Sequence, residues 1–327
     1  MASDRTARSA SATPPAAAGG VASSRPAPKK THYSLLTRRD TITLWVMAGI
    51  PTLVVLVFIL VPTFSSILLS FTTWNGIGGL GSIKFAGLQN YIDLVTVYKP
   101  FVPALEHNVI WLIFFLLIAT PLGMFFAVLL DKNIRGTRVY QSALYMPVVL
   151  SLAIVGFIWQ LIYAPEQGLL NNLLGRTAQG NQISWLGDPT INLWAVLIAA
   201  SWRQVGYVMV LYLAGLKGVD PSLREAASID GASEIETFRH VVFPVMKPIN
   251  MVILVITVIE SLRAFDLAFI VNKGLNGLEL LSTLVTNNII GESSRIGFGS
   301  AIAVVLLVIS IGPILFYLFN SMREEIQ

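Results

Sequence analysis

The sequence predicts an all-α, polytopic membrane protein with six transmembrane helices. Hydrophobic residues make up 54% of the 327 residues and charged residues only 12%, whereas a soluble domain carries about 25% charged residues. A membrane-spanning helix needs about 20 consecutive, mostly apolar residues. Six segments meet this requirement, at about 42–70, 108–130, 139–163, 191–215, 249–271 and 299–320.

The composition also excludes several kinds of site. The chain has no cysteine, which excludes disulfides, thiol catalysis and cysteine metal sites. Its three histidines, His32, His107 and His240, are too far apart in the sequence to indicate a metal cluster. The net charge is +4, and basic residues lie beside the apolar segments, where they indicate membrane topology and not nucleic-acid binding. We therefore expect no bound metal and no nucleic-acid partner.

Residues 1–40 form a separate region that we expect to be a disordered, basic, cytoplasmic tail. They are rich in Ala, Ser and Pro and contain almost no large apolar side chains, so they cannot bury a core. Arg38 and Arg39 are similar to the start of a twin-arginine export signal, but the apolar segment 42–71 is too long for one and has no small-residue cleavage site. We interpret the arginine pair as an anchor for the first span, and residues 41–327 as one transmembrane domain.

The distribution of lysine and arginine predicts that both termini lie in the cytoplasm. With the N-terminus inside, fifteen of these residues fall in cytoplasmic segments, and five fall in the outer loops at about 72–107, 164–190 and 272–298. This excess follows the positive-inside rule, here for a multi-pass protein of the inner (plasma) membrane. It also places the polar loop 217–248 in the cytoplasm.

The loop 217–248 has a pattern that is not typical of a flexible connector. Its first part can form a helix with one apolar side. Asp230-Gly231 then supplies a turn at which the backbone bends easily. A second short helix is expected over residues 232–240, ending before Pro244. Two short helices bent at a glycine form a compact knob, which we interpret as a docking element.

The same loop contains a longer pattern of residues, Glu225-Ala-Ala-Ser-Ile-Asp-Gly-Ala232, Phe238, Val241, Pro244 and Pro248. The pattern combines fixed identities, a fixed length and a place between two membrane spans. In these respects the loop resembles the EAA loop of ABC importer permeases, the membrane subunits of binding-protein-dependent uptake systems. The chain is most similar to the carbohydrate branch, typified by the larger permease subunit of the maltose importer, over about residues 41–320.

The resemblance implies that the first helix of the knob docks in a groove of a separate ATPase subunit. Glu225 would make polar contacts at the ATPase surface, Gly231 would permit the close bend, and the alanines would keep the helix slim. The chain contains no Gly-x-x-x-x-Gly-Lys-Ser/Thr phosphate loop, so ATP and Mg²⁺ would be held by the ATPase. We therefore expect a non-catalytic translocation subunit without a cofactor of its own. The expected ATPase-coupling residues are Glu225, Ala226, Ala227, Asp230, Gly231, Ala232 and Pro244.

Charged residues inside the fourth and fifth spans mark a second candidate site. An ionisable group at mid-membrane costs about 2.5–3.5 kcal/mol on insertion scales, so it normally faces a cavity or a partner. Glu260, Arg263 and Asp266 follow at steps of three, which places them on one broad helical face. A sugar requires bidentate polar groups and aromatic rings, and the resemblance places the substrate cavity between these two spans. In the family, Thr257 and Ser261 correspond to polar cavity positions. The expected substrate-binding residues are Arg203, Gln204, Tyr207, Thr257, Glu260, Ser261, Arg263 and Asp266.

Other interpretations stay open at this point. The same charges can form structural ion pairs, Glu260 with Arg263 and Arg203 with Asp266. The two arginines also suit an anionic solute such as a glycerol phosphate. An ion-coupled secondary transporter would use the charges of the fifth span as a proton relay, but the broken-helix repeats of such transporters are not evident in the sequence. A membrane-embedded enzyme would need a metal spacing or a nucleophile–base pair, and we find neither.

The resemblance thus implies that the chain is the permease subunit of an ATP-driven ABC importer that works by alternating access. The resemblance implies a second permease, two ATPase subunits and an extracytoplasmic solute-binding protein as partners. The substrate would be a mono- or oligosaccharide that the binding protein delivers, and membrane lipid would surround the spans.

Overall fold

The computed structural model describes residues 37–132, 134–178, 180–291 and 294–324. Within these residues every named element is a helix, and the β-structure is one isolated bridge between Thr72 and Phe85. The predicted all-α class is therefore confirmed. Residues 1–36 of the tail that we expect to be disordered lie outside the described residues.

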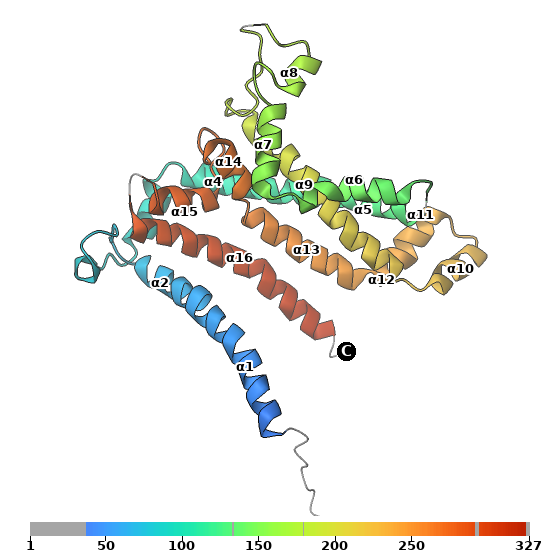
Figure 1. The fold of residues 1–327 in the computed structure, drawn as a ribbon, viewed down its shortest axis with the longest axis horizontal. Coiled ribbons are helices and arrows are strands. Elements are labelled where there is room, and N and C mark those ends of the chain that lie inside the picture. Colours follow the sequence, from blue (N-terminus) through green and yellow to red (C-terminus); the bar gives the residue numbers. More distant parts are fainter. Residues whose placement is uncertain (1–36, 133, 179, 292–293, 325–327) are drawn as a thin grey trace, which may run out of the picture. The chain divides into compact units, whose positions relative to one another are not determined.

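The chain divides into two compact units, Met1–Val55 and Leu56–Gln327. The described part of the first unit contains the helix α1, Arg38–Val55 (Figure 1), in which no side chain is buried. Its first turn is held by Asp40, whose carboxylate accepts hydrogen bonds from the backbone N–H and the hydroxyl of Thr37 at 2.9 and 2.6 Å. A helix that is apolar on all sides requires lipid or a partner around it.

The second unit contains the other helices of the described residues (Figure 1). Three of them, named η1, η3 and η4, are π-helical turns, and η2 is a 3₁₀ turn. In chain order they are η1 (Leu56–Leu60), α2 (Val61–Leu69), η2 (Leu80–Ser82), α3 (Gln89–Thr96), α4 (Phe101–Phe114), η3 (Phe115–Ala119), α5 (Thr120–Asp131), α6 (Thr137–Val149), α7 (Leu152–Ile162), α8 (Leu169–Leu173), α9 (Asn192–Lys217), α10 (Pro221–Ile229), α11 (Glu234–Thr237), η4 (Phe238–Val242), α12 (Phe243–Val245), α13 (Lys247–Leu262), α14 (Asp266–Asn272), α15 (Leu281–Ile289) and α16 (Ile296–Glu324).

Among the described residues, four continuous helical stretches are long and apolar enough to cross a membrane. They are Arg38–Leu69, Phe101–Asp131, Asn192–Lys217 and Ile296–Pro313, and they overlap the first, second, fourth and sixth predicted spans. A sharp bend divides the third predicted span, whereas the fifth predicted span follows a bend of 76° at Met246, between Glu234–Val245 and Lys247–Asn272. The structure therefore contains up to six spans, if each bent pair counts as one.

The third predicted span, 139–163, is not one straight helix. It is divided between α6 and α7, whose axes differ by 103°. Leu150 and Ser151 between them are extended, and the Ser151 hydroxyl caps α7 by accepting a hydrogen bond from the N–H of Ile154 at 3.3 Å. Pro147 near the end of α6 also lacks the N–H that a helix interior needs. The predicted span is therefore bent, and apolar length does not reveal the local cap at which it bends.

The fifth predicted span, 249–271, is interrupted as well. Residues 263–265 lie outside any helix, between the end of α13 and the start of α14. The Ser282 hydroxyl donates to the carbonyl of Ala264 at 2.5 Å, and the Asn108 amide donates to the carbonyl of Ser261 at 3.4 Å. These side chains satisfy backbone carbonyls near the break, as the interior of a membrane requires. Helix breaks that are not evident in the sequence are thus present in two spans.

Each π-helical turn in the described residues ends two residues before a proline. The pairs are η1 with Pro62, η3 with Pro121 and η4 with Pro244. A proline has no N–H, and its ring pushes away the carbonyl four residues earlier, so the helix widens at that carbonyl. The expectation that the second helix of the knob ends before Pro244 is therefore wrong, because this helix continues past the proline. It passes through η4 and α12 and ends at Val245.

Of the four continuous candidate spans in the described residues, the long helix α9 is the most deeply buried, and it packs against α5 and α6 (Figure 1). The contact with α5 is close because Gly123 has no side chain. A Cβ atom built there would lie 2.8 Å from Cγ1 of Val208. Gly206 allows the same approach to α6, since a Cβ atom there would lie 2.2 Å from the carbonyl oxygen of Leu144. Because closely packed interiors have low compressibility, we expect a displacement of α5 or α6 to be transmitted to α9.

We expect Gly206→Ala to destabilise the protein by about 1–3 kcal/mol, because the added methyl group meets backbone that cannot move aside. The measurement is the midpoint of thermal unfolding in detergent micelles. Gly312→Ala is the matched control, since it is also a glycine inside a helix and a Cβ atom there meets nothing within 4 Å. Equal midpoints for the two variants would contradict the close contact between α6 and α9.

Candidate functional site

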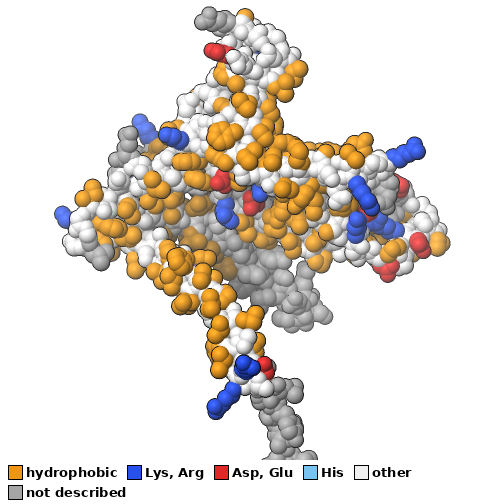
Figure 2. Space-filling view, viewed as in Figure 1, with side chains coloured by type: hydrophobic (Ala, Val, Ile, Leu, Met, Phe, Trp, Pro, Cys, Tyr) orange, Lys and Arg blue, Asp and Glu red, His pale blue; other side chains and the backbone are white. Residues whose placement is uncertain are grey.

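Charged side chains gather over α10 and α11 on the face shown in Figure 2, and a smaller group lies near α13 and α14. The first group belongs to the knob in the loop 217–248. The second lies in the region where α9, α13 and α14 contact one another. Both regions contain residues for which we expect a functional role from the sequence.

The knob contains both expected short helices, each with a polar cap at its start. The Asp220 carboxylate accepts a hydrogen bond from the N–H of Ser222 at 2.9 Å and begins α10. Gly231 then adopts a φ of +80°, the left-handed backbone that turns the chain. Ser233 and Glu236 form a capping box at the start of α11. The second helix begins at α11 and not at residue 232, because this box defines its first turn.

The two capping carboxylates, those of Asp220 and Glu236, have lowered pKa values and are ionised at neutral pH. The N–H of Ser222 lowers the pKa of Asp220, and the N–H of Ser233 lowers the pKa of Glu236. A carboxylate with a lowered pKa stabilises the folded state above its unfolded pKa, and this stabilisation is lost as the pH falls through the lowered value. The caps of the knob are therefore intact throughout the neutral range.

Most of the predicted coupling residues are exposed. Ile229 and Ile235, on either side of the Gly231 bend, are 85% and 80% exposed, and the sequence analysis did not select them as site residues. Ala232 is half-buried. Ala227 is buried, so it packs within this chain and is not available to a partner. The exposed members of the predicted set are Glu225, Ala226, Asp230, Gly231 and Pro244.

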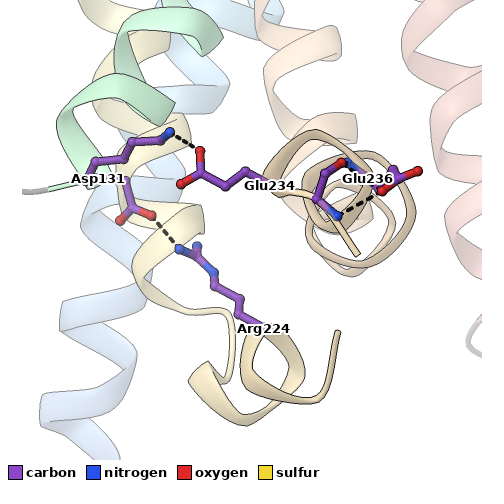
Figure 3. A network of polar contacts seen from close by, with 6 residues as sticks. Asp131, Arg224, Glu234 and Glu236 are labelled. Carbon is purple, nitrogen blue, oxygen red and sulfur yellow. Dashed lines mark hydrogen bonds and ion pairs between the residues drawn. The ribbon is translucent and has the colours of Figure 1, made fainter. Parts of the chain in front are cut away.

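The knob is joined to the end of α5 by two ion pairs that the sequence analysis did not predict. Arg224 binds Asp131, and Lys132 binds Glu234 (Figure 3). These partners are about 90–100 residues apart in the sequence, so no local spacing could have indicated the contacts. The only available signal was the charge of the four side chains at the ends of predicted helices.

The second site is a small pocket between α9, the α13–α14 break and the aromatic residues Trp111 and Phe115. Its volume is about 50 Å³, whereas pockets for drug-sized ligands measure roughly 300–1,000 Å³. The pocket is therefore too small for a sugar in this conformation. It brings together five of the predicted substrate residues, which are Arg203, Gln204, Glu260, Arg263 and Asp266.

The break in the fifth span changes how these charges are arranged. Arg263 caps the end of α13, and Asp266 begins α14. The expectation that Glu260, Arg263 and Asp266 share one helical face is therefore wrong. The non-helical residues between α13 and α14 wrap around the pocket instead.

The charges of the pocket are only loosely paired. Nη1 of Arg203 lies 4.0 Å from Oε2 of Glu260, and the side chains are 29% and 42% exposed. The Nε atom of Arg203 and the Nε2 atom of Gln204 are buried and have no hydrogen-bond partner. Of the described residues, Arg203 forms an ion pair with Glu260 and not with Asp266, and Glu260 forms none with Arg263. Buried donors without partners are available to the acceptor atoms of a ligand.

Three predicted substrate residues do not line this pocket. Thr257 and Ser261 are fully buried, and the Ser261 hydroxyl donates to the carbonyl of Thr257 at 2.7 Å. The hydroxyl of Thr257 lies 3.4 Å from that of Thr120 on α5. Tyr207 is half-buried on α9, one turn beyond Arg203. The aromatic side chains that line the pocket are those of Trp111, Phe115 and Phe265, which the sequence analysis did not select.

Comparisons with known proteins agree with this architecture. Residues 119–324 match the model of the family described as "binding-protein-dependent transport system inner membrane component". The xylose/arabinose import permease of Haloferax volcanii is 31% identical over 279 residues, which cover 84% of this chain and 87% of that protein. The arabinooligosaccharide transport permease of Bacillus subtilis is 30% identical over 260 residues, which cover 78% of this chain and 80% of that protein.

Solved structures give the same result for the fold. A bacterial ABC transporter involved in the import of the acidic polysaccharide alginate contains a chain that superposes with a TM-score of 0.72 at 20% identity. The superposition covers 87% of this chain and 98% of that chain. A bacterial alginate ABC transporter in complex with an alginate pentasaccharide-bound periplasmic protein gives a TM-score of 0.73, also at 20% identity, over 87% and 95% of the two chains.

The loose geometry of the Arg203–Glu260 pair predicts a weak interaction. A double-mutant cycle with Arg203→Gln and Glu260→Gln should give a coupling energy below about 1 kcal/mol, since both side chains are partly exposed and 4.0 Å apart. The measurement is the free energy of reversible unfolding in mixed detergent micelles. A coupling energy above about 2 kcal/mol would show that the pair is a structural ion pair and would contradict the interpretation as a ligand pocket.

Proposed function

The chain belongs to the family of binding-protein-dependent transport system inner membrane components, and from this membership we propose that it is the permease subunit of an ATP-driven importer of sugars. The names of the relatives support this solute class, since they are permeases for pentoses and for arabinose oligosaccharides. The observation in this chain that carries the proposal is the composition of the pocket between α9 and α13.

The pocket suits an uncharged, polyhydroxylated solute. Two arginines, Arg203 and Arg263, face two carboxylates, Glu260 and Asp266, so the formal charge of the lining is balanced. Sugar hydroxyls can accept from the unpaired donors of Arg203 and Gln204 and can donate to the carboxylates. Rings such as that of Trp111 supply the apolar face that sugars stack on. The sugar would enter when the pocket widens during alternating access, with a second permease completing the cavity.

The energy for transport would come from other subunits. We infer that two ATPase subunits hold ATP and Mg²⁺ and contact the exposed side of the knob, where Glu225, Asp230, Ile229 and Ile235 are available. An extracytoplasmic binding protein would deliver the sugar to the outer face, as one similar alginate transporter was solved with a periplasmic protein bound. This chain would itself catalyse no reaction.

The distribution of lysine and arginine along the sequence supports an orientation for the chain in the membrane. The excess of lysine and arginine in the tail and in the loop 217–248 favours a multi-pass protein of the inner membrane with both termini in the cytoplasm. In that orientation the knob faces the compartment that contains ATP. An ion-coupled secondary transporter would share the broken spans, but it would give no role to the exposed knob.

A reconstituted complex tests the proposal directly. The chain, its companion permease, the ATPase and the binding protein are assembled in liposomes, and ATP hydrolysis is measured with neutral saccharides, uronate oligosaccharides and glycerol phosphates. We expect neutral saccharides to stimulate hydrolysis and to accumulate inside. Stimulation by glycerol phosphates alone would contradict the solute class. Uptake driven by a proton gradient with this chain alone would contradict the whole assignment.

The knob gives a second test, at Gly231. Gly231→Pro should abolish stimulated hydrolysis and uptake, because proline cannot adopt a φ of +80°. Gly231→Asn should retain most of both activities, since asparagine tolerates left-handed backbone and a Cβ atom there meets nothing within 4 Å. Membrane insertion should be unchanged in both variants. Normal uptake by Gly231→Pro would show that the bend is not needed for coupling.

A further inference from the structure

Arg224 binds the knob to the ends of two membrane helices at once. Its Nη1 donates to Oδ2 of Asp131, the last residue of α5, at 2.8 Å. Its Nη2 donates to the carbonyl of Leu216, in the last turn of α9, at 3.3 Å. Figure 3 shows Arg224 reaching from α10 toward Asp131. One side chain therefore connects α10, α5 and α9.

The position of this guanidinium group favours a strong contact. The last carbonyls of a helix carry partial negative charge, which an arginine there offsets. The Leu216 carbonyl also accepts a hydrogen bond from the N–H of Val219 at 3.4 Å, so Arg224 adds a second, charged donor to it. The Asp131 side chain is only 16% exposed and that of Arg224 is 38% exposed. The neighbouring pair differs, since the side chains of Lys132 and Glu234 are 49% and 81% exposed. Exposed pairs of this kind contribute little.

Apolar contacts also join the second helix of the knob to α5, since Phe238 and Val242 of η4 pack in the same hydrophobic cluster as Leu130. The first helix of the knob, α10, makes few contacts with α5 apart from the bridge. A groove of about 270 Å³ lies between them, and Asp131, Arg224 and Phe238 are among its lining residues. The groove means that packing leaves space beside Asp131 and Arg224. The polar bridge from Arg224 is therefore the contact that connects α10 itself to the end of α5.

Beyond the bridge, the connection to the pocket is tight. The close approach at Gly123 locks α5 to α9, and the buried residues Ala127, Met209 and Leu213 pack in the same cluster. α9 carries Arg203 and Gln204, which line the pocket. Packed helices, and not loops, therefore connect the bridge to the pocket. A displacement of α10 that Arg224 transmits to α5 and α9 would move the residues that line the pocket.

We propose that Arg224 and Asp131 form a permanent mechanical link, which makes the ATPase-facing helix α10 move as one body with α5 and α9. Arg224 is a positioning residue in this scheme and contacts neither nucleotide nor solute. The inference rests on the proposed function and deepens it, since it names the residues that carry force from the knob to the pocket. It predicts that the link stays closed throughout the transport cycle.

The test uses the complete complex in liposomes and measures the ratio of solute taken up to ATP hydrolysed. Arg224→Gln and Asp131→Asn should each lower this ratio about fivefold or more, while basal hydrolysis continues. Arg224→Lys should recover only part of the ratio, because it retains the charge but not the fork that reaches two helices. The matched control is Lys132→Gln with Glu234→Gln, which should stay within twofold of the wild type.

A covalent link distinguishes the mechanism from a merely structural role. The chain has no cysteine, so Asp131→Cys together with Arg224→Cys can be joined selectively by a short bis-maleimide. Joining the two positions should restore the ratio that the uncrosslinked double variant loses. A crosslink that blocks uptake would show that the two helices must separate, and it would overturn the proposal.

The outcomes also separate this inference from the proposed function. If the wild-type complex shows no solute-stimulated hydrolysis, the proposed function fails. If it does, but Arg224→Gln and Asp131→Asn keep the wild-type ratio, only the link fails. An equal loss in the Lys132/Glu234 control would likewise overturn it, because that pair should be dispensable.

Discussion

Inside a bilayer, backbone N–H and carbonyl groups have no water to bind, and this constraint shapes the second unit of the chain more than any other. Most of its described residues are helical for that reason, and the two breaks within predicted spans come with local compensation. At the α13–α14 break, Ser282 and Asn108 satisfy the carbonyls of Ala264 and Ser261. At the α6–α7 break, the Ser151 hydroxyl binds a free N–H. Polar side chains in the spans are therefore partly structural.

The same breaks create the conditions for function. One helix ends at Arg263 and the next begins at Asp266, so the charged side chains lie around a pocket. In a regular helix the same side chains would lie along one face. The knob uses the opposite arrangement. There, caps and one left-handed glycine hold two short helices in a rigid knob, and Arg224 ties that knob to α5 and α9.

Some of this could be predicted from the sequence, because its signals are local. The knob follows from Asp-Gly and its flanking helix formers, and the span positions follow from apolar length. The break at residues 263–265 was not predictable in the same way, since its stabilising partners come from segments that are distant in the sequence. The pairing of Arg224 with Asp131 has the same origin. The burial of Ala227 depends on which side of α10 faces the chain, and the alanine pattern alone does not determine that.

The π-helical turns change which residues of a span lie on the same face of its helix. Each inserts roughly one extra residue relative to an α-helical turn, so residues four apart on opposite sides of η3 no longer lie above one another. A helical wheel drawn through Phe101–Asp131 would assign wrong neighbours to one half of that helix, by roughly 100° of rotation. If each position along this helix is labelled in turn by a water-soluble reagent, the extent of labelling should therefore vary with the helical period on both sides of η3. The phase of this variation should shift at η3, the turn before Pro121.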